Sequence, residues 1–481
     1  MSVLVCDIGT SSVRAAVVDA DANVLHEQHR VCLPDSPAPG LVEFDAEAMA
    51  AVVIEAATTA LDAYGAAVAA VGITNQRGSA VVWDRATGVP VAPAQGWQDL
   101  RTIVSCLTHR AAGFRFAPNS SATKIESVLD AVDPERERDL CFGTVDSWIA
   151  WNLSEGALHV TDASNAAVTS IRQADGTGWH AGALEVLRIP ERMLPEVVDT
   201  SGLLGPATAL PGAPPITALI GDQQASLVGQ GCVAPGPAKI TFGTGGMLDL
   251  VVGPERPGFE TRGGGGTFPI VTMQRGGIPT WGLEAIMLSA GTNVEWLRDD
   301  LGVLATSEES HPVAQQCTDT GGVTYVPALM GLGTPRWDYG ARGTLLGLTR
   351  GSGRPQIVRA VLEGIAARGA DLVEAAELDS GRPIELLRVD GGMSRNPTFV
   401  QALADAAQKP VEISPHCEAT TLGAGFMAGL AVGMWTDLDA LGATWAPLAR
   451  YEPGAPTDRD QWRRAVERAA EWLPELSAVD F

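Results

Sequence analysis

The chain has little positive charge. Its 481 residues include 33 Lys and Arg against 57 Asp and Glu, which gives a net charge of −24. A surface of this charge repels the backbone of nucleic acids and anionic lipid headgroups. We therefore expect no nucleic acid and no membrane among its partners. An anionic ligand would have to be held locally, by backbone amides, helix N-termini and a metal ion.

Cysteine is scarce and shows no pattern. The seven cysteines are dispersed, odd in number and form no C-x-x-C pair, so a disulfide framework is not expected. A metal site or a catalytic thiol would need ligand spacing and a nearby His cluster, which the sequence lacks. We interpret all seven as reduced core residues: Cys6, Cys32, Cys106, Cys141, Cys232, Cys317 and Cys417.

Long hydrophobic runs are absent as well. Met1 leads almost at once into an apolar strand, with no basic segment before it and no run long enough to cross a membrane. We therefore expect a cytoplasmic protein. With 46% hydrophobic and 19% charged residues, the composition is that of an ordinary globular chain. The length exceeds what one hydrophobic core supports, which predicts two domains with a cleft between them.

The N-terminal segment has the pattern of a β-hairpin. Residues 3–6 and 13–18 are apolar strands around a polar turn at 7–12, and residues 24–28 add a third strand. In this turn, Gly9 permits an unusual backbone angle, and the amides and hydroxyls of Thr10, Ser11 and Ser12 can converge on phosphate oxygens. Asp7 would orient Mg²⁺ through water. A tight turn without a ligand explains an isolated segment of this kind equally well.

A second hairpin favours the phosphate-binding interpretation over a tight turn without a ligand. Residues 238–242 and 247–252 are strands around the turn GTGG at 243–246. Two such tips that face one another would hold the β- and γ-phosphates of a nucleotide from opposite sides. We place the boundary between the two halves near residue 227.

A further strand, residues 386–390, ends in Gly391 and Gly392 and is followed by Asn396 and Pro397 at a helix start. Glycine at this point lets a flat ring approach the backbone, which favours a contact with adenosine. Asn396 caps the helix in either case.

Together these segments resemble the FGGY family of carbohydrate kinases, and within it the glycerol kinases most closely. The likeness extends over nearly the whole chain and rests on GITNQR (72–77), WQD (97–99), GDQQA (221–225), WLRD (296–299), GLG (331–333) and GG (391–392). It implies an α/β fold of two actin-like (ribonuclease H-like) ATPase domains, each with a mixed sheet, around an active-site cleft. Residues 1–227 would form the substrate-binding domain and residues 228–481 the nucleotide-binding domain.

The resemblance also implies ATP, with Mg²⁺, as the phosphoryl donor. Residues of the two hairpins would contact phosphate, and residues of the second half would surround the nucleoside. The residues expected to contact phosphate are Thr10, Ser11, Ser12, Arg14 and Thr244. Those expected to surround the nucleoside are Gly291, Glu295, Gly391, Gly392 and Asn396. Glu295 stands where glycerol kinases usually have glutamine.

Asp222 would be the general base. It follows the apolar stretch 216–220 and precedes a helix. A carboxylate within about 3 Å of the attacking hydroxyl can orient it and accept its proton. A helix N-cap is the alternative for an isolated Asp, and the context QQA at 223–225 favours the base.

The implied substrate pocket departs from glycerol kinases at three positions. Gly78 replaces the carboxylate that follows the arginine, Asn119 aligns with a tyrosine, and Met247 aligns with a phenylalanine. Because buried hydroxyls without partners cost free energy, such a pocket should bind glycerol less well or bind something larger. The other substrate residues implied are Arg77, Trp97, Asp222 and Gln223. A core position for Trp97 and a surface ion pair for Arg77 are the alternatives.

We thus expect a kinase that transfers phosphate from ATP to a hydroxyl of a small polyol or sugar. Glycerol and larger acceptors such as a tetritol or a pentulose are candidates. A catalytically inactive sugar or nucleotide sensor and an actin-like or chaperone-type ATPase are alternatives of other classes. Retention of Asp7, Thr10, Asp222 and Thr244 argues against the sensor, and a matched substrate set argues against the ATPase. A homodimer is expected at the level of the family.

Overall fold

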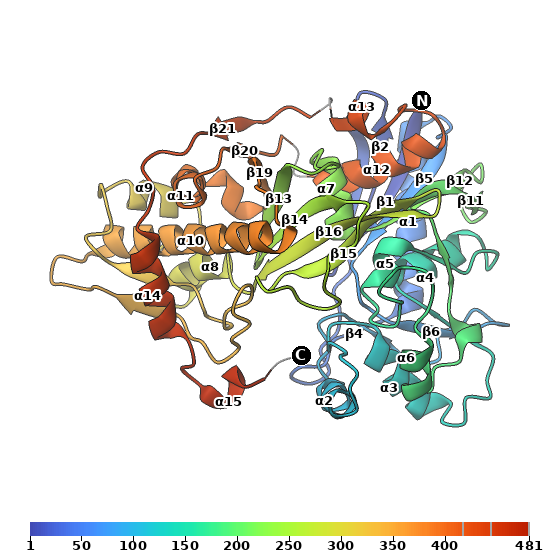
Figure 1. Ribbon diagram of the computed structural model, residues 1–481. Helices are drawn as coiled ribbons and strands as arrows, with labels where there is room; N and C mark the ends of the chain where they lie inside the picture. Colours follow the sequence, from blue (N-terminus) through green and yellow to red (C-terminus); the bar gives the residue numbers. More distant parts are fainter. Residues whose placement is uncertain (416–417, 443–444, 480–481) are drawn as a thin grey trace.

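The computed structural model of the chain describes residues 1–415, 418–442 and 445–479. Two mixed β-sheets lie next to each other, with helices on their faces (Figure 1). The sheet of the N-terminal half has the strand order β11-β12-β5-β1-β2-β3. Its strands are β1 (Ser2–Ile8), β2 (Ser12–Asp19), β3 (Val24–Val31), β5 (Ala70–Asn75), β11 (Ser201–Pro206) and β12 (Pro215–Gly221).

The sheet of the C-terminal half has the order β15-β16-β14-β13-β19-β20-β21. Its strands are β13 (Pro237–Phe242), β14 (Gly246–Gly253), β15 (Phe268–Arg275), β16 (Ile278–Met287), β19 (Leu386–Asp390), β20 (Val411–Ile413) and β21 (Ala449–Tyr451).

The two sheets repeat one topology. In each, an antiparallel hairpin (β1 with β2, β13 with β14) is joined by a strand parallel to its first member (β5, β19) and then by a second parallel strand (β12, β20). Both hairpins and the mixed sheet in each half are thereby confirmed. The repeat places the two glycine-containing tips at equivalent ends of the two sheets.

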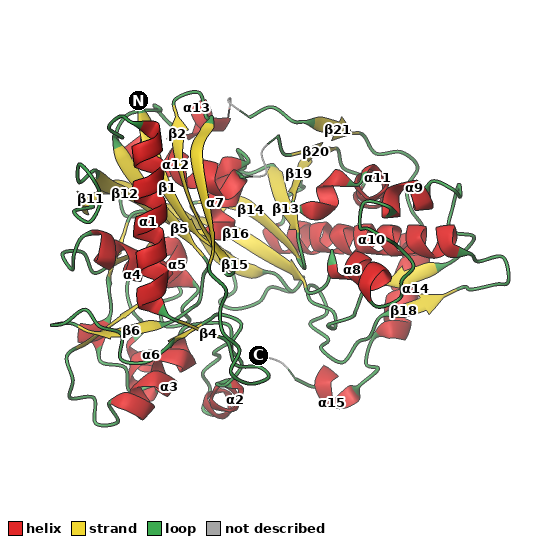
Figure 2. Cartoon of the chain, turned by 180° about the vertical axis from the view of Figure 1, so that it is seen from behind, coloured by secondary structure: helices red, strands yellow, loops and turns green. Residues whose placement is uncertain are grey.

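Two long helices occupy equivalent places in the halves. α1 (Ala46–Tyr64) begins after Asp45, whose carboxylate accepts a hydrogen bond from the amide of Ala48 at 2.9 Å. α10 (Arg354–Ser380) lies between the hairpin and β19 in the chain, as α1 lies between the hairpin and β5. Figure 2 shows α1 in front of the first sheet and α10 running across the second half. Each helix covers an apolar sheet face and closes a hydrophobic core.

The other face of the first sheet carries α7 (Asp222–Gly229) and α12 (Ala419–Ala431), which pack against each other. Alternate residues of β1, Val3 and Val5, contribute to this second core. α12 belongs to the C-terminal half of the chain, so the two halves share a helix layer at their junction. The expected boundary near residue 227 falls inside α7 and stays a prediction.

The remaining helices and strands complete the two halves. In the N-terminal half they are β4 (Glu43–Phe44), β6 (Val81–Asp84), β7 (Ala94–Gln95), α2 (Ile103–Ala111), α3 (Ala122–Val132), β8 (Leu140–Gly143), α4 (Val145–Leu153), β9 (Val160–Asp162), α5 (Ala163–Ala167), α6 (Ala181–Val186) and β10 (Glu196–Val198). In the C-terminal half they are α8 (Thr292–Asp299), α9 (Ser310–Ala314), β17 (Thr324–Val326), β18 (Thr344–Leu346), α11 (Pro397–Ala407), α13 (Leu438–Gly442), α14 (Arg459–Ala469) and α15 (Pro474–Ser477).

The cysteines in the described ranges are free thiols, as expected. Four of them are buried, whereas Cys32 and Cys317 are partly exposed, so the expectation of a core position is wrong for these two. Cys417 lies outside the described residues. None of the described helices has the length and apolar character of a membrane span.

Candidate active site

The first hairpin tip follows β1. The amide of Gly9 donates to the carbonyl of Ser12 at 2.9 Å and closes the turn. Asp7, at the end of β1, accepts a hydrogen bond from the Thr421 hydroxyl at 3.3 Å, a contact from α12. Burial raises the pKa of Asp7 to about 6, an effect opposed by Arg14 and reinforced by the negative charge of Asp222. Asp7 and Asp222 therefore lie in one electrostatic environment.

Arg14 is held by carboxylates. Its guanidinium lies 3.8 Å from Asp7 and 3.2 Å from Glu27, and it also pairs with Glu418 at the N-terminus of α12. Arg14 was expected to contact phosphate, and it stands beside the tip in an acidic setting. Its phosphate contact stays a prediction.

Asp222 is the first residue of α7 and follows β12 directly. Its Oδ1 accepts a hydrogen bond from the amide of Gln223 at 2.7 Å and lies 3.5 Å from Nε of Arg77. Burial raises the pKa of Asp222, while Arg77 and then the Gln223 amide oppose the rise. Burial therefore removes much of the water around the carboxylate. Because 29% of the side chain is still exposed, a ligand can reach it.

Arg77 comes from the loop after β5 and is mostly buried, with 11% of its side chain exposed. Its Nη2 donates to Oε2 of Glu284, on β16 of the other half, at 2.6 Å. The interpretation of Arg77 as a surface ion-pair partner is therefore wrong. Arg77 connects the predicted base to the C-terminal half.

Gly78, Trp97 and Asn119 lie together, as the resemblance implied. Gly78 has a φ of +74°, and a Cβ there would overlap the carbonyl oxygen of Asn119 and come within 3.7 Å of the Trp97 Cβ. Trp97 is 37% exposed and its indole nitrogen donates to the Thr10 hydroxyl at 3.0 Å. Trp97 is thus not a core aromatic, and it joins the expected substrate wall to the expected phosphate tip.

Gln223 and Met247 face the same region from opposite halves. The Gln223 side-chain oxygen accepts a hydrogen bond from Nζ of Lys239, on β13, at 2.9 Å. Met247 lies on β14 two residues before Asp249, so both point to one side of the sheet. Lys239 and Asp249 form a buried ion pair at 2.8 Å, with both side chains 0% exposed.

Sequence reasoning missed Lys239, Asp249 and Glu284. A signal existed, because each is a charged residue inside an otherwise apolar strand, where burial demands a partner. The partners come from strands and loops distant in the chain, which the sequence alone did not reveal.

The predicted nucleotide residues gather around the second hairpin tip. The amide of Gly291, at the N-terminus of α8, donates to the carbonyl of Gly243 at 2.8 Å, and the amide of Ala290 donates to the carbonyl of Thr244 at 2.8 Å. Glu295 follows one turn later on α8 and is exposed. The structure thus brings Thr244, Gly291 and Glu295 together.

The loop after β19 approaches the same tip. A Cβ on Gly391 would overlap the carbonyl of Phe242, whereas a Cβ on Gly392 or Gly243 would meet no atom within 4 Å. Open space at two glycines fits a ligand that lies against the backbone. Asn396 is the N-cap of α11, as expected, and its side-chain NH₂ group also donates to the Ser310 hydroxyl at 2.9 Å. Its contact with adenosine stays a prediction.

Among the described residues, no group of three or more His, Cys, Asp or Glu side chains could hold a metal ion alone. The negative charge of Asp222 nevertheless raises the pKa of Asp7, an effect that a divalent cation would oppose. This sparse set fits Mg²⁺, which keeps several waters and uses one or two carboxylates plus phosphate oxygens.

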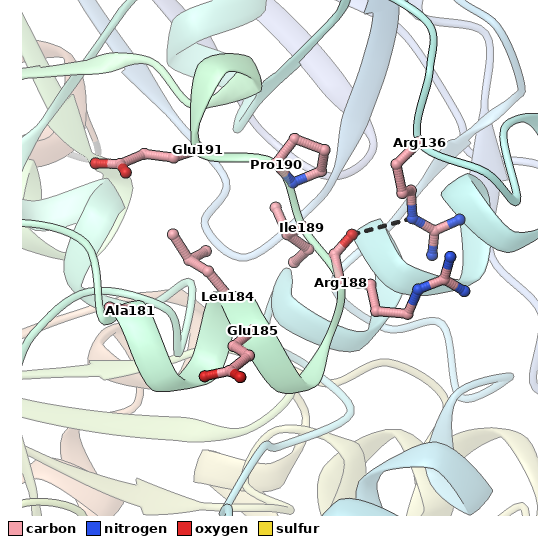
Figure 3. Close-up of a pocket in the computed structure, with 8 residues that line it drawn as sticks. All are labelled: Arg136, Ala181, Leu184, Glu185, Arg188, Ile189, Pro190 and Glu191. Atoms are coloured by element: carbon pink, nitrogen blue, oxygen red, sulfur yellow. Dashed lines mark hydrogen bonds between the residues drawn. The ribbon is translucent and has the colours of Figure 1, made fainter.

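A surface hollow of about 380 Å³ lies elsewhere, beside α6 (Figure 3). The Nε of Arg136 donates to the carbonyl of Arg188 at 3.0 Å on its rim. None of the expected site residues lines this hollow.

Known proteins resemble this chain over nearly its whole length. Residues 2–229 match the N-terminal domain of the FGGY family of carbohydrate kinases, and residues 238–432 match its C-terminal domain. The chain is 42% identical to a glycerol kinase of Aromatoleum aromaticum over 98% of this chain and 99% of that protein. It is 39% identical to glycerol kinase 2 of Thermotoga maritima, with 98% and 99% covered.

A crystal structure of Plasmodium falciparum glycerol kinase with ADP superposes with a TM-score of 0.91 at 28% identity, covering 100% of this chain and 99% of that one. The two-domain fold expected from the sequence is thereby confirmed. The chain belongs to the FGGY family of carbohydrate kinases.

Proposed function

We propose that the protein transfers the γ-phosphoryl group of ATP to a hydroxyl of a small polyol, as its relatives named glycerol kinase suggest. The observation that carries the proposal is the contact of Arg77 with Asp222 at 3.5 Å, at the point where the two halves meet. A buried cation beside a partly open carboxylate suits the binding and deprotonation of an alcohol.

In this proposal Asp222 orients the acceptor hydroxyl and takes its proton late in the transfer, because phosphoryl transfer passes through a loose transition state. Arg77 and Gln223 donate hydrogen bonds to other acceptor hydroxyls, and Trp97 forms an apolar wall. Thr10, Ser11, Ser12 and Thr244 hold phosphate oxygens, while Gly392 and Asn396 lie against the nucleoside. Mg²⁺, when bound near Asp7, would neutralise developing charge on the phosphates.

Glycerol is the first acceptor to test, and a tetritol or a pentulose is the second. Gly78 leaves the pocket without the carboxylate that glycerol kinases place there, which argues for weaker glycerol binding. An ADP-release assay with glycerol, tetritols and pentuloses would decide. Glycerol with the highest kcat/KM by a wide margin would overturn the larger acceptor.

Replacement of the base tests the proposed chemistry. Asp222→Asn should lower kcat by a factor of about 10³ or more, because it removes the proton acceptor and keeps the shape. ATP affinity, measured by calorimetry, should stay within about threefold of the parent, since Asp222 is assigned to the acceptor. An unchanged kcat would refute the assignment. A cytoplasmic location and a homodimer stay predictions, the latter for light scattering to test.

A further inference from the structure

The second sheet carries a row of buried charges on the side that faces the first half. Lys239, Asp249 and Glu284 lie opposite one another on β13, β14 and β16. They are 0%, 0% and 7% exposed. The residues that alternate with them, such as Ile240 and Leu248, pack into the core under α10. Three buried charges require hydrogen-bond or ion-pair partners. The identity of these partners indicates the role of the row.

Both ends of the row reach into the N-terminal half. Glu284 accepts a hydrogen bond from Nη2 of Arg77 at 2.6 Å, and Lys239 donates one to the side-chain oxygen of Gln223 at 2.9 Å. Asp249 pairs with Lys239 at 2.8 Å between them. Arg77 and Gln223 are the two predicted acceptor-binding residues that flank Asp222.

The contact with Glu284 determines where the guanidinium of Arg77 points. Nη2 is used by Glu284, Nε lies 3.5 Å from Asp222, and Nη1 is buried without a hydrogen-bond partner. Without Glu284, the nearest carboxylate for Arg77 would be that of Asp222. A bidentate Arg77–Asp222 pair would then occupy the oxygens that the base needs for the acceptor.

Lys239 has the matching role for Gln223. Because the amide oxygen of Gln223 accepts from Lys239, its NH₂ group is directed away from Lys239 and remains available as a donor. A hydroxyl oxygen of a polyol is the complementary acceptor.

We propose that the C-terminal sheet positions the acceptor site of the N-terminal half, with Glu284 keeping Nη2 of Arg77 from a bidentate pair with Asp222 and the Lys239–Asp249 pair fixing the amide of Gln223. Glu284 and Lys239 are positioning residues in this arrangement. The inference rests on the proposed function, since Arg77 and Gln223 bind an acceptor only if the protein is a polyol kinase.

Glu284→Gln tests the inference, because it keeps the shape and removes the charge. With the best acceptor of the polyol panel, we expect the acceptor KM to rise about tenfold and kcat to fall about tenfold. The KM for ATP should stay within about twofold, since no expected nucleotide residue contacts the row. Glu412→Gln is the matched control: Glu412 is a buried carboxylate on β20 of the same sheet, pairs with Arg388 at 3.4 Å and touches no site residue.

A double-mutant cycle with Arg77→Lys separates positioning from a general structural role. In the Arg77→Lys background, Glu284→Gln should raise the acceptor KM by less than about twofold, because the guanidinium it positions is gone. An equal rise in both backgrounds, or an equal effect of Glu412→Gln, would overturn the inference. If Glu284→Gln does not fold, Glu284→Asp replaces it: this variant keeps the charge but not the reach, and a parental acceptor KM would again overturn the inference. A parent protein without acceptor-stimulated turnover would instead refute the proposed function itself.

Discussion

Gly78 occupies a position where no other side chain fits, and this constrains the proposed acceptor pocket. Its φ is +74°, and a Cβ would overlap the backbone of Asn119. Gly78→Ala should therefore lower the free energy of unfolding by about 2 kcal/mol and raise the acceptor KM, because Asn119 must move. Denaturant titration and steady-state kinetics measure both effects.

Gly202→Ala is the control for Gly78→Ala, since Gly202 has no atom near its Cβ position. It should change stability by less than about 0.5 kcal/mol. A Gly78→Ala protein as stable as this control would contradict the account. The same overlap means that a carboxylate side chain cannot be placed at residue 78 without moving the backbone.

The pH dependence of activity follows from the buried carboxylates at the junction. Burial raises the pKa of Asp7 to about 6 and also raises the pKa of Asp222. Both groups must be ionised in the proposed reaction, and a raised pKa means that they take up protons already in mild acid. The acceptor kcat/KM should therefore fall as the pH drops through about 6, by about tenfold per unit below it.

A rate profile between about pH 5 and 8 checks this prediction. Higher Mg²⁺ concentration should move the acid limb to lower pH, because a bound cation favours the ionised carboxylate. A flat profile across this range, or an acid limb whose position does not change with Mg²⁺ concentration, would contradict the roles given to Asp7 and Asp222.

Single residues with local signatures could be predicted, whereas their long-range partners could not. Asp222 and Arg77 stand in recognisable segments, and the structure brings them within 3.5 Å. Glu284 lies 207 positions from Arg77 in the chain, and nothing in its own strand indicates that partner. The partner of Asp249 likewise follows only from the register of β13 and β14, which places Asp249 opposite Lys239.

At the scale of elements, α7 and α12 cross at backbone contact. A Cβ on Gly423 of α12 would overlap the carbonyl of Ala225, and a Cβ on Gly229 of α7 would overlap the carbonyl of Ala419. Gly423→Ala should push the helices apart, lower the free energy of unfolding by about 3 kcal/mol and reduce kcat, because α7 carries Asp222. Thermal unfolding and kinetics together test this.

Gly425→Ala, in the same helix, is the comparison. The three atoms nearest to its Cβ would be side-chain atoms of Val18, at 3.1 Å or more, a tight contact that is still milder than the backbone overlap at Gly423. Its effect on stability should be less than half that of Gly423→Ala. Equal effects would show that any alanine in α12 is harmful and that the close crossing has no special role.

The elements themselves were predictable where turn chemistry and apolar runs agree. The hairpins around 7–12 and 243–246, the strand Leu386–Asp390 and the Asn396 cap are confirmed. The place of α12 was not predictable, because its apolar character fits packing on either sheet, and only the assembled fold puts it against β1, β5 and β12.

At the scale of the whole molecule, the repeated topology explains why the candidate site lies at the junction of the halves. Equivalent hairpin tips come from β1–β2 and β13–β14, and the charge row Lys239–Asp249–Glu284 joins the second sheet to Arg77 and Gln223. Two domains were expected from the length of the chain, and their α/β fold was implied by the resemblance to the FGGY family. The relative placement of the halves depends on side-chain packing between segments distant in the chain. Local sequence patterns do not indicate which of these segments pack together.

The most direct test of the account is phosphorus NMR of the purified protein with ATP, Mg²⁺ and glycerol or the best acceptor of the panel. We predict that a phosphomonoester resonance of the polyol appears in step with ADP, and that Asp222→Asn abolishes it. Release of inorganic phosphate at the same rate with and without the polyol, or no turnover of ATP with any acceptor, would contradict the central claim that Asp222 directs phosphoryl transfer to an alcohol.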